Sequence, residues 1–404
     1  MFNPFAPGFA ENPYDEYRIQ RETEPIQQTP FGPWMIFDYA ESLRLLRDVS
    51  LSVDVRKAIE ILGEDPRDRA KVRAELFPDR PPREDTSILN IDPPDHTRLR
   101  KLVGSVFTPR QVAGLAPMIE RIVDEHLDNV EKTQEMDLIA DLAFPVPFAV
   151  ITEMLGMPDG NSEELRDWSH ALVKILDFTI GPEELTAALL AGENLREHVA
   201  EVIKWKRSNL GEDLLSALIL AEDNGDVLNE SELLDQVNVL FIAGHETTVN
   251  LIGNGTWALL QSRDQLELLR DDPSVEATAI DELLRYDSPI QISRRITLEP
   301  IQIAGNTIEA GSFILTSLGS ANRDPAAFGT TADQLDLRRS DAARHLSFGS
   351  GTHHCVGASL ARLEGTIAIT RLIRRFPNIE AIDVPAWNGR VVLRGMDSLN
   401  LSLT

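Results

Sequence analysis

One long segment without proline constrains the fold of this chain more than any other feature. Helical periodicity runs from about Ser231 to Gln261, and no proline interrupts it. At about 1.5 Å per residue, a helix of this length would measure roughly 45 Å. That is enough to cross a whole domain, so we expect this helix at the centre of the fold.

Helical patterns dominate the rest of the chain, and strand signals are few. Apolar residues follow three- and four-residue steps over 115–130 and again over 360–373. Short alternating patterns at 34–36, 301–303 and 313–315 indicate strands, and a turn around Arg394 to Asp397 would join two C-terminal ones. We predict one domain over residues 1–404, mainly α with small antiparallel β-sheets. The charged, proline-containing segment 55–86 is expected to be mobile.

Composition places the chain among globular proteins and excludes some partners. Of its 404 residues, 42% are hydrophobic and 26% are charged. The formal net charge of −26 argues against nucleic acid or an anionic membrane surface as a partner. The first residues lack the basic and apolar regions of a signal peptide or membrane anchor. We expect a cytoplasmic protein that is a monomer.

Cys355 is the only cysteine of the chain, which excludes an internal disulfide and a thiolate-rich metal cluster. Most free cysteines are small buried hydrophobes. Here, however, two glycines precede the sulfur and a helical pattern begins at Val356. The start of a helix favours the thiolate, which is the form that binds metal. Gly351 and Gly357 would let the backbone come close to a flat ligand.

The long helix carries an unusual run at its centre, Ala243-Gly244-His245-Glu246-Thr247-Thr248. Glycine inside a helix costs about 1 kcal/mol relative to alanine. One interpretation is a packing notch with a threonine bonded back to the previous turn. The other is chemical: Gly244 leaves room for a small diatomic ligand, Thr247 donates to a bound oxygen, and Glu246 supplies protons. His245 is expected to be a helix-face histidine in a hydrogen bond.

These two segments resemble the cytochrome P450 family. Its haem-thiolate loop reads Phe-x-x-Gly-x-(Arg or His)-x-Cys-x-Gly, and every fixed place is filled here by Phe348, Gly351, His353, Cys355 and Gly357. Its acid–alcohol pair, (Ala or Gly)-Gly-x-(Asp or Glu)-Thr-(Thr or Ser), matches residues 243–248, with glutamate as the less usual acid. The resemblance implies the family's fold, with haem b between the long helix and the helix after Cys355, and the Cys355 thiolate as iron ligand.

The resemblance also implies which residues hold the haem. His96 and Arg100 lie four residues apart on one face of a helix and could by themselves be a solvated basic face. In the family, residues at these places bind the haem propionates. Arg295 and His353 would complete the set, although Arg294 is the alternative to Arg295. Further cofactor contacts are expected from Phe348, Gly349, Gly357 and Ala243.

A charged pair before the cysteine is expected to support the fold. Glu282 and Arg285 lie three residues apart, a spacing that is common by chance on helix surfaces. In the family this pair is buried and a later arginine joins it. Arg339 fits that place by spacing, with Arg338 as the alternative. We assign these residues to folding and to support of the haem loop.

The implied reaction inserts one oxygen atom from dioxygen into an apolar small molecule, which could be a terpenoid, steroid, fatty acid or polyketide. The catalytic residues would be Gly244, Glu246 and Thr247. The chain has no cysteines for an iron–sulfur cluster and no flavin domain, so a ferredoxin and its reductase would supply electrons. The outward-facing residues among Arg98, Arg100, Lys101 and Arg110 would form the docking patch.

Substrate contacts are inferred only by position in the family. They would come from the loop before Asp92, the middle of the long helix and the segment after Arg285, with a mobile roof elsewhere. Those positions give Ile88, Leu89, Leu240, Ala243, Pro289, Ile290 and Ile292, and the roof would be Leu172, Ile175, Leu176 and Phe178.

Two other functions stay open at this point. The first is a haem-thiolate enzyme that uses peroxide or rearranges its substrate, although such members often lack the acid–alcohol pair that Glu246 and Thr247 provide here. The second is a haem sensor or carrier without enzymatic activity, but the chain has no appended regulatory domain.

Overall fold

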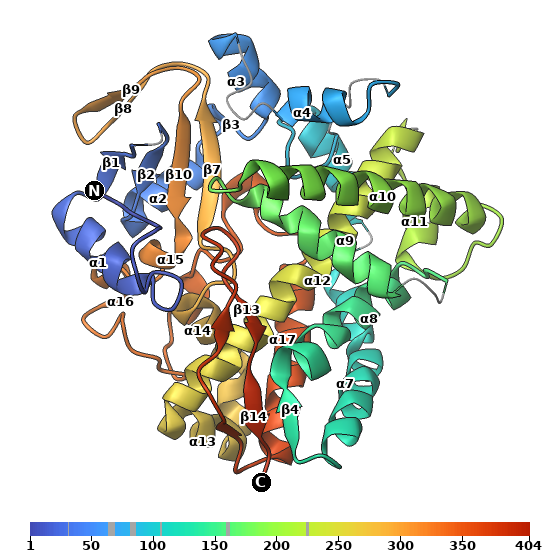
Figure 1. The fold of residues 1–404 in the computed structure, drawn as a ribbon, viewed down its shortest axis with the longest axis vertical. Helices are drawn as coiled ribbons and strands as arrows, with labels where there is room; N and C mark the ends of the chain where they lie inside the picture. The colour runs from blue at the N-terminus through green and yellow to red at the C-terminus, as the bar shows by residue number, and fades with distance from the viewer. Residues whose placement is uncertain (31, 64–68, 81–85, 106, 159–161, 224–225) are drawn as a thin grey trace.

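The computed structural model describes residues 1–404 except 31, 64–68, 81–85, 106, 159–161 and 224–225. Helix α12, Glu230–Gln261, runs through the middle of the molecule, which confirms the long central helix (Figure 1). It begins with a capping box, in which Asn229 and Glu232 each bond the other's backbone N–H at 2.9 Å. This cap satisfies donors that the first helical turn would otherwise leave open.

Glycines let α12 and α17, Ala358–Arg375, pack closely. A Cβ on Gly255 would lie 3.1 Å from Ile369, and a Cβ on Gly365 would lie 2.8 Å from Leu251. The two contacts are four residues apart on both helices, so the helices run in the same general direction. Counting back two turns brings the middle of α12 level with the start of α17.

The other helices surround this pair and form most of the right and lower parts of the molecule in Figure 1. The α-helices are α1 Tyr14–Thr23, α2 Tyr39–Arg47, α3 Val55–Leu62, α4 Arg69–Leu76, α5 Asp95–Gly104, α6 Pro109–Gly114, α7 Ala116–Val130, α8 Pro145–Met154, α9 Ser162–Val173, α10 Pro182–Lys206, α11 Leu214–Leu220, α13 Arg263–Asp271, α14 Glu276–Tyr286, α15 Leu318–Ala321 and α16 Pro325–Phe328. The short helical turns are η1 Ile139–Ala143, η2 Lys174–Leu176, η3 Pro273–Val275, η4 Ala342–Arg344 and η5 Gly351–His353.

A five-stranded sheet lies on the left in Figure 1, in the order β1-β2-β10-β7-β3. Its strands are β1 Ile26–Gln28, β2 Trp34–Ile36, β3 Leu51–Ser52, β7 Ile292–Thr297 and β10 Phe313–Ser317. All its pairs are antiparallel except β2 with β10, where Leu315 pairs with Met35 in parallel. The sheet is therefore mixed, which differs from the expectation of antiparallel sheets. No short turn forces a direction on two strands so far apart in sequence.

The remaining sheets are small and antiparallel. They are β11-β14-β4, β12-β13, β5-β6 and β8-β9, built from β4 Glu135–Asp137, β5 Glu222–Asp223, β6 Asp226–Val227, β8 Ile301–Ile303, β9 Asn306–Ile308, β11 Glu380–Ala381, β12 Ala386–Trp387, β13 Met396–Ser398 and β14 Asn400–Ser402.

The predicted C-terminal turn is wrong. Met396–Ser398 is a strand paired with Ala386–Trp387, so the chain reverses between those strands and not at 394–397. Gly389 lies in this connection with φ +68°, a left-handed conformation that glycine adopts without strain. Asn388-Gly389 is therefore the stronger turn signal.

The described residues of segment 55–86 form α3 and α4 with short non-helical stretches beside them, and residues 64–68 and 81–85 lie outside the described part. Two arginines of this segment bond the α10 carboxylate of Glu193: Arg73 Nη2 at 3.0 Å and Arg80 Nη1 at 2.7 Å. These ion pairs hold α4 against α10. Among the described helices, none is both long and apolar enough to span a bilayer.

Candidate active site

The loop before α17 is a tight turn that depends on glycine. The Cys355 backbone N–H donates to Phe348 O at 2.9 Å, and Gly349 and Gly351 both have positive φ, +67° and +74°. A Cβ on Gly351 would lie 2.7 Å from Leu46 O of α2, closer than a side chain tolerates. The loop therefore has one conformation, fixed against α2, and it presents Cys355 just before the helix.

The Cys355 side chain is exposed, although it lies deep in the protein. Burial raises the pKa of its thiol, while the Gly357 N–H and the charges of Arg100 and Arg362 act in the opposite direction. The net direction is upward, so burial outweighs the helix start, although the Gly357 N–H favours the thiolate as expected from sequence. Binding a metal ion would deprotonate the thiol, as it does for coordinating thiols in general. Gly357 leaves the sulfur uncrowded, since its Cβ would lie 4.0 Å from Sγ.

One stripe of α12 is accessible in an otherwise buried helix. Ala243 is exposed and Thr247 is half-buried, whereas their neighbours Phe241, His245, Glu246 and Thr248 are buried. Ala243 and Thr247 lie one turn apart, on the stretch of α12 that is level with the start of α17. This stripe and the exposed sulfur are two accessible surfaces at the same level of the α12–α17 pair, as a haem between these helices would require.

The Thr247 hydroxyl donates to Ala243 O at 2.9 Å, as the structural interpretation of this run requires. A hydroxyl has one proton and two lone pairs, so Thr247 in this rotamer can only accept from a further partner. It can therefore hold and orient a water, but it must rotate to donate to a bound oxygen.

Gly244 points away from the accessible stripe. A Cβ on Gly244 would lie 3.1 Å from Ile151 Cδ1 of α8. Its lack of a side chain therefore serves close packing of α12 on α8. The expectation that Gly244 leaves room for a diatomic ligand is wrong, because Ile151 fills that space, and the accessible small residue is Ala243.

Glu246 is buried, and its Oε1 has no hydrogen-bond partner. His245 Nε2 lies 3.6 Å from this oxygen. His245 also hydrogen-bonds Phe241 O at 2.7 Å, as expected for a helix-face histidine.

The predicted propionate residues form a cluster of nitrogen donors in which the two arginines carry the charge. His96 is 2% exposed, neither of its ring nitrogens has a partner, and its ring lies 4.1 Å from that of His353. Burial, followed by the charges of His96 and Arg295, lowers the pKa of His353 to about 4. Burial also lowers the pKa of Arg295 to about 10. Buried donors without acceptors are what a pair of haem carboxylates would satisfy.

Arg295 is better placed for that role than Arg294. Arg295 is buried and donates to Leu46 O at 3.1 Å, the same carbonyl that approaches Gly351 of the cysteine loop. Arg294 donates to Val53 O at 3.1 Å and lies over the Phe313 ring. Arg100 donates to His354 O at 2.5 Å, beside the cysteine. His96, Arg100, Arg295 and His353 thus surround the cysteine loop, and these residues fit a haem.

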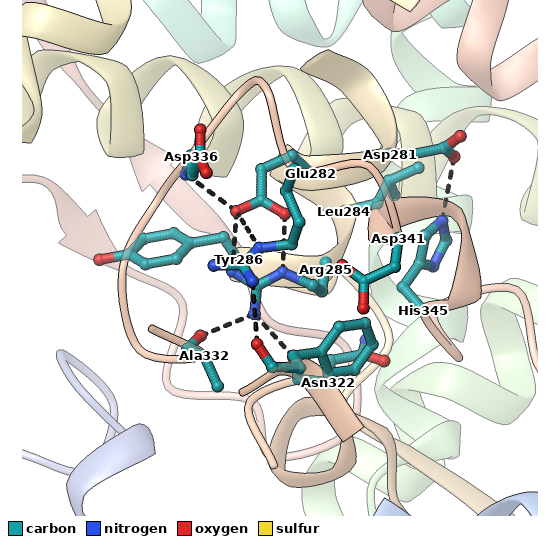
Figure 2. A network of polar contacts seen from close by, with 12 residues as sticks. Asp281, Glu282, Leu284, Arg285, Tyr286, Asn322, Ala332, Asp336, Asp341 and His345 are labelled. Carbon is teal, nitrogen blue, oxygen red and sulfur yellow. Dashed lines mark hydrogen bonds and ion pairs between the residues drawn. The ribbon is translucent and has the colours of Figure 1, made fainter. Parts of the chain in front are cut away.

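A satisfied charge network joins α14 to residues 322–339 (Figure 2). Glu282 and Arg285 are both fully buried, with Arg285 Nε at 2.7 Å from Glu282 Oε2. Arg285 also donates to the carbonyls of Asn322, Ala332 and Gln334 at 2.7–2.9 Å. Arg339 joins Glu282 at 3.2 Å, which confirms the predicted partner.

Arg338 is mostly exposed and pairs with Asp272 instead.

The proposed substrate residues do not all lie together. Ile88 and Leu240 share one apolar cluster, with Leu172 packed against it, whereas Ile292 and Phe178 belong to a second with the N-terminal aromatic residues. Ile290 packs against a third cluster. Pro289 is buried and Ile175 is half-buried, while Leu89 and Leu176 are 50% and 40% exposed. The positions stay predictions.

Sequence reasoning missed one buried acid. Glu364 of α17 is 1% exposed, and its Oε2 has no partner. Burial raises the pKa of this carboxyl well above its usual value. The signal was present: Glu364 lies one turn after Leu360 on the apolar face of a predicted helix.

A polar pocket of about 150 Å³ was also not predicted. It lies between α9 and the C-terminal hairpin, and His170, Arg390 and Asp397 are among its lining residues.

Comparison with known proteins gives one consistent result. The profile of the family described as Cytochrome P450 matches residues 49–273 and 260–381. Cytochrome P450 107B1 of Saccharopolyspora erythraea is 40% identical over 403 residues, covering 98% of this chain and 96% of its own. The polyketide biosynthesis cytochrome P450 PksS of Bacillus subtilis is 38% identical, covering 100% of this chain and 99% of its own.

Among solved structures, P450BioI in complex with an acyl carrier protein ligated to hexadec-9Z-enoic acid superposes with a TM-score of 0.88. It is 34% identical and covers 98% of both chains.

Proposed function

Because this chain belongs to the cytochrome P450 family, we propose that it inserts one oxygen atom from dioxygen into an acyl or polyketide-like chain. The monooxygenase class follows from the family, since similar proteins are named as a monooxygenase and as hydroxylases. The substrate and the role of each residue are proposals. The observation that carries them is the accessible Cys355 sulfur, together with the partnerless ring nitrogens of His96 and the accessible Ala243–Thr247 stripe.

Haem bound through Cys355 supplies the dioxygen activation and the oxygen transfer. Cys355 would be the iron ligand, and the nitrogen donors of His96, Arg100, Arg295 and His353 would bind the propionates. Phe348, Gly349 and Gly357 shape the loop around the sulfur, and Arg362 lies 4.6 Å from the Phe348 ring centroid. Preorganised charges and hydrogen bonds of this kind tune a thiolate ligand.

Thr247 and Glu246 would manage protons on the α12 side. Thr247 presents lone pairs that can fix a water, since its proton is used by Ala243 O. Glu246 is the nearest acid along the helix and can exchange a proton with such a water. Gly244 contributes by packing α12 against α8, which fixes the height of both side chains.

An acyl or polyketide-like substrate is supported by the printed names of similar proteins. PksS is named for polyketide biosynthesis, and the P450BioI structure holds an acyl carrier protein with a sixteen-carbon unsaturated acid. The aliphatic cluster of Ile88 and Leu240 would suit such a chain.

Electrons would come from a ferredoxin and its reductase, docked near α5. Lys101 and Arg110 are exposed there, whereas Arg98 pairs with Glu232 of α12 and Arg100 bonds the cysteine loop. Of the four basic residues predicted as the docking patch, Lys101 and Arg110 therefore remain as candidates. A single domain, a monomeric state and a cytoplasmic location stay predictions.

Two measurements test the proposal. The reduced, carbon-monoxide-bound protein should show the strongly red-shifted Soret band of a thiolate ligand, and Cys355→Ser should abolish it. Retention of that band in the variant would remove Cys355 from the iron. Turnover with hydrogen peroxide alone, as fast as with electron donors, would favour the peroxide-driven alternative.

For the substrate, the ferric protein is titrated with three probes: hexadecenoic acid, its acyl carrier protein thioester and a macrolide. The proposal expects loss of the iron-bound water on addition of an acyl probe. Lack of response to all three would contradict the substrate class.

A further inference from the structure

His245, which precedes the acid Glu246 in α12, is fully buried and has no contact with solvent. His245 is 0% exposed, and the rings of Phe144, Phe148 and Phe241 lie 5.1–5.8 Å from its ring. An imidazole inside such an aromatic cage needs protein partners for both nitrogens. The identity of those partners determines how many protons it carries.

The partners of Nδ1 and Nε2 differ in what they allow. Nδ1 lies 2.7 Å from Phe241 O, and a carbonyl only accepts, so Nδ1 carries a proton. Nε2 lies 3.0 Å from Ser169 Oγ of α9 and 3.6 Å from Glu246 Oε1. Nε2 therefore faces two oxygens, and one of them belongs to an acid.

The single hydroxyl proton of Ser169 can also be donated to a backbone carbonyl of α9. Ser169 Oγ also lies 2.9 Å from Leu165 O and 3.0 Å from Arg166 O, both of which can only accept. If Ser169 donates to one of these carbonyls, it must accept from His245, and Nε2 then carries a proton as well. In that arrangement His245 is an imidazolium and Glu246 a carboxylate. Glu246 Oε1, which has no hydrogen bond, then lies 3.6 Å from a positive charge.

The surroundings of Glu246 favour its charged form. Burial would raise the pKa of Glu246, but the His245 contact and charge, followed by the charges of Arg390 and His170, lower it below its usual value. His170 of α9 contacts Arg390 of the hairpin at 3.0 Å, and both line the polar pocket together with Asp397. On the α8 side the cage contributes Phe144 and Phe148, with Arg166 stacked outside Phe144 at 4.6 Å.

We propose that His245 is a positioning residue that shares one proton with Glu246 beside the accessible stripe of α12. This rests on the proposed function, since it assigns Glu246 its proton partner. In the transfer, Nε2–H turns from Ser169 Oγ towards Glu246 Oε1, 3.6 Å away, the N–H bond breaks and an O–H bond forms on Oε1. The ion pair becomes a neutral pair, and no electrons move. Ser169 can then donate its own proton to the freed lone pair of Nε2.

The first experiment follows the Glu246 carboxyl directly by infrared difference spectroscopy of the haem-loaded protein over a pH range. Glu246→Gln identifies the band of the protonated acid. His245→Phe removes the charge that holds Glu246 ionised, so the midpoint of that band should move up by about one pH unit or more. His245→Gln keeps a donor but cannot titrate, and should give a smaller shift. An unchanged midpoint in both variants would overturn the proposal.

A matched control is His126→Gln, which removes a partly exposed histidine of α7 and should leave the band in place. If His245→Phe does not fold, ¹⁵N-histidine NMR of Glu246→Gln provides the second test. Proton occupancy at His245 Nε2 should fall without the carboxylate, and an unchanged titration would equally overturn the proposal. The carbon-monoxide Soret band is recorded for each variant, so loss of the haem site is distinguished from loss of the shared proton.

Discussion

Two buried glutamates of this protein have opposite surroundings. Glu282 receives Arg285 through both carboxylate oxygens at 2.7 and 2.8 Å, the Asp336 N–H at 2.9 Å and Arg339 at 3.2 Å. Glu246 has one oxygen without a hydrogen bond and a histidine at 3.6 Å. A fully satisfied carboxylate cannot release or gain a proton cheaply, whereas an underbonded one can. The number of hydrogen bonds that each carboxylate accepts thus distinguishes Glu282, which supports the fold, from Glu246, which is free to exchange a proton.

The largest expected effect comes from breaking the satisfied network. Arg285→Leu leaves Glu282 buried with Arg339 as its remaining charged partner and frees three carbonyls, so the free energy of unfolding should fall by about 3–5 kcal/mol. Urea unfolding measures this. The control is Arg338→Leu, which removes an exposed ion pair and should cost no more than about 1 kcal/mol. An equal loss of unfolding free energy in Arg285→Leu and Arg338→Leu would show that the buried network is no more stabilising than an exposed ion pair.

The underbonded acid should show the reverse behaviour. Glu246→Gln keeps the shape but cannot transfer a proton, so product formation should fall about 100-fold or more. Stability should change little, since the amide fills the same space. The rate is measured with an acyl probe that displaces the iron-bound water. Thr248→Val, which removes a hydroxyl bonded at 3.3 Å to Gly244 O, serves as the neighbouring control.

Glu364 is a third buried glutamate, and the pH dependence of stability tests whether its carboxyl lacks a partner. Its pKa is raised in the folded protein, so the folded state keeps a proton that the unfolded state loses above the ordinary carboxyl range. Wild-type stability should therefore decline as pH rises from that range towards the folded pKa. Glu364→Gln should gain on the wild type by up to about 1.4 kcal/mol per pH unit over this window. Parallel stability curves for the two proteins would show that Glu364 has a partner in solution.

The smallest effect is expected at the surface. Lys101→Glu should slow reduction by a ferredoxin a few-fold at low salt, and the difference should vanish at high salt. Stability should not change, because the side chain is exposed. Stopped-flow reduction at two ionic strengths measures both, and unchanged kinetics at low salt would move the docking patch away from α5.

The sequence predicted the features that depend on local chemistry. The long helix was visible as periodicity, whereas the cysteine loop and the Glu282–Arg285–Arg339 group were predicted from their resemblance to motifs of the family. Sequence did not show the direction in which Gly244 points, because helix rotation is set by packing against Ile151. The Ser169 contact of His245 joins residues 76 positions apart and has no local signal. The C-terminal turn was misplaced because pairing of Ala386 with Ser398 overrode the local pattern.

The parallel pairing of β2 with β10 has a consequence for biosynthesis. β1 and β2 pair with each other, but β2 meets its second partner, β10, only after residues 313–317 have been made (Figure 1). At the usual rates of translation, the first strands therefore wait on the order of tens of seconds with an open edge. A nascent chain of this protein should thus need protection of its first fifty residues by a chaperone until the last third of the chain emerges.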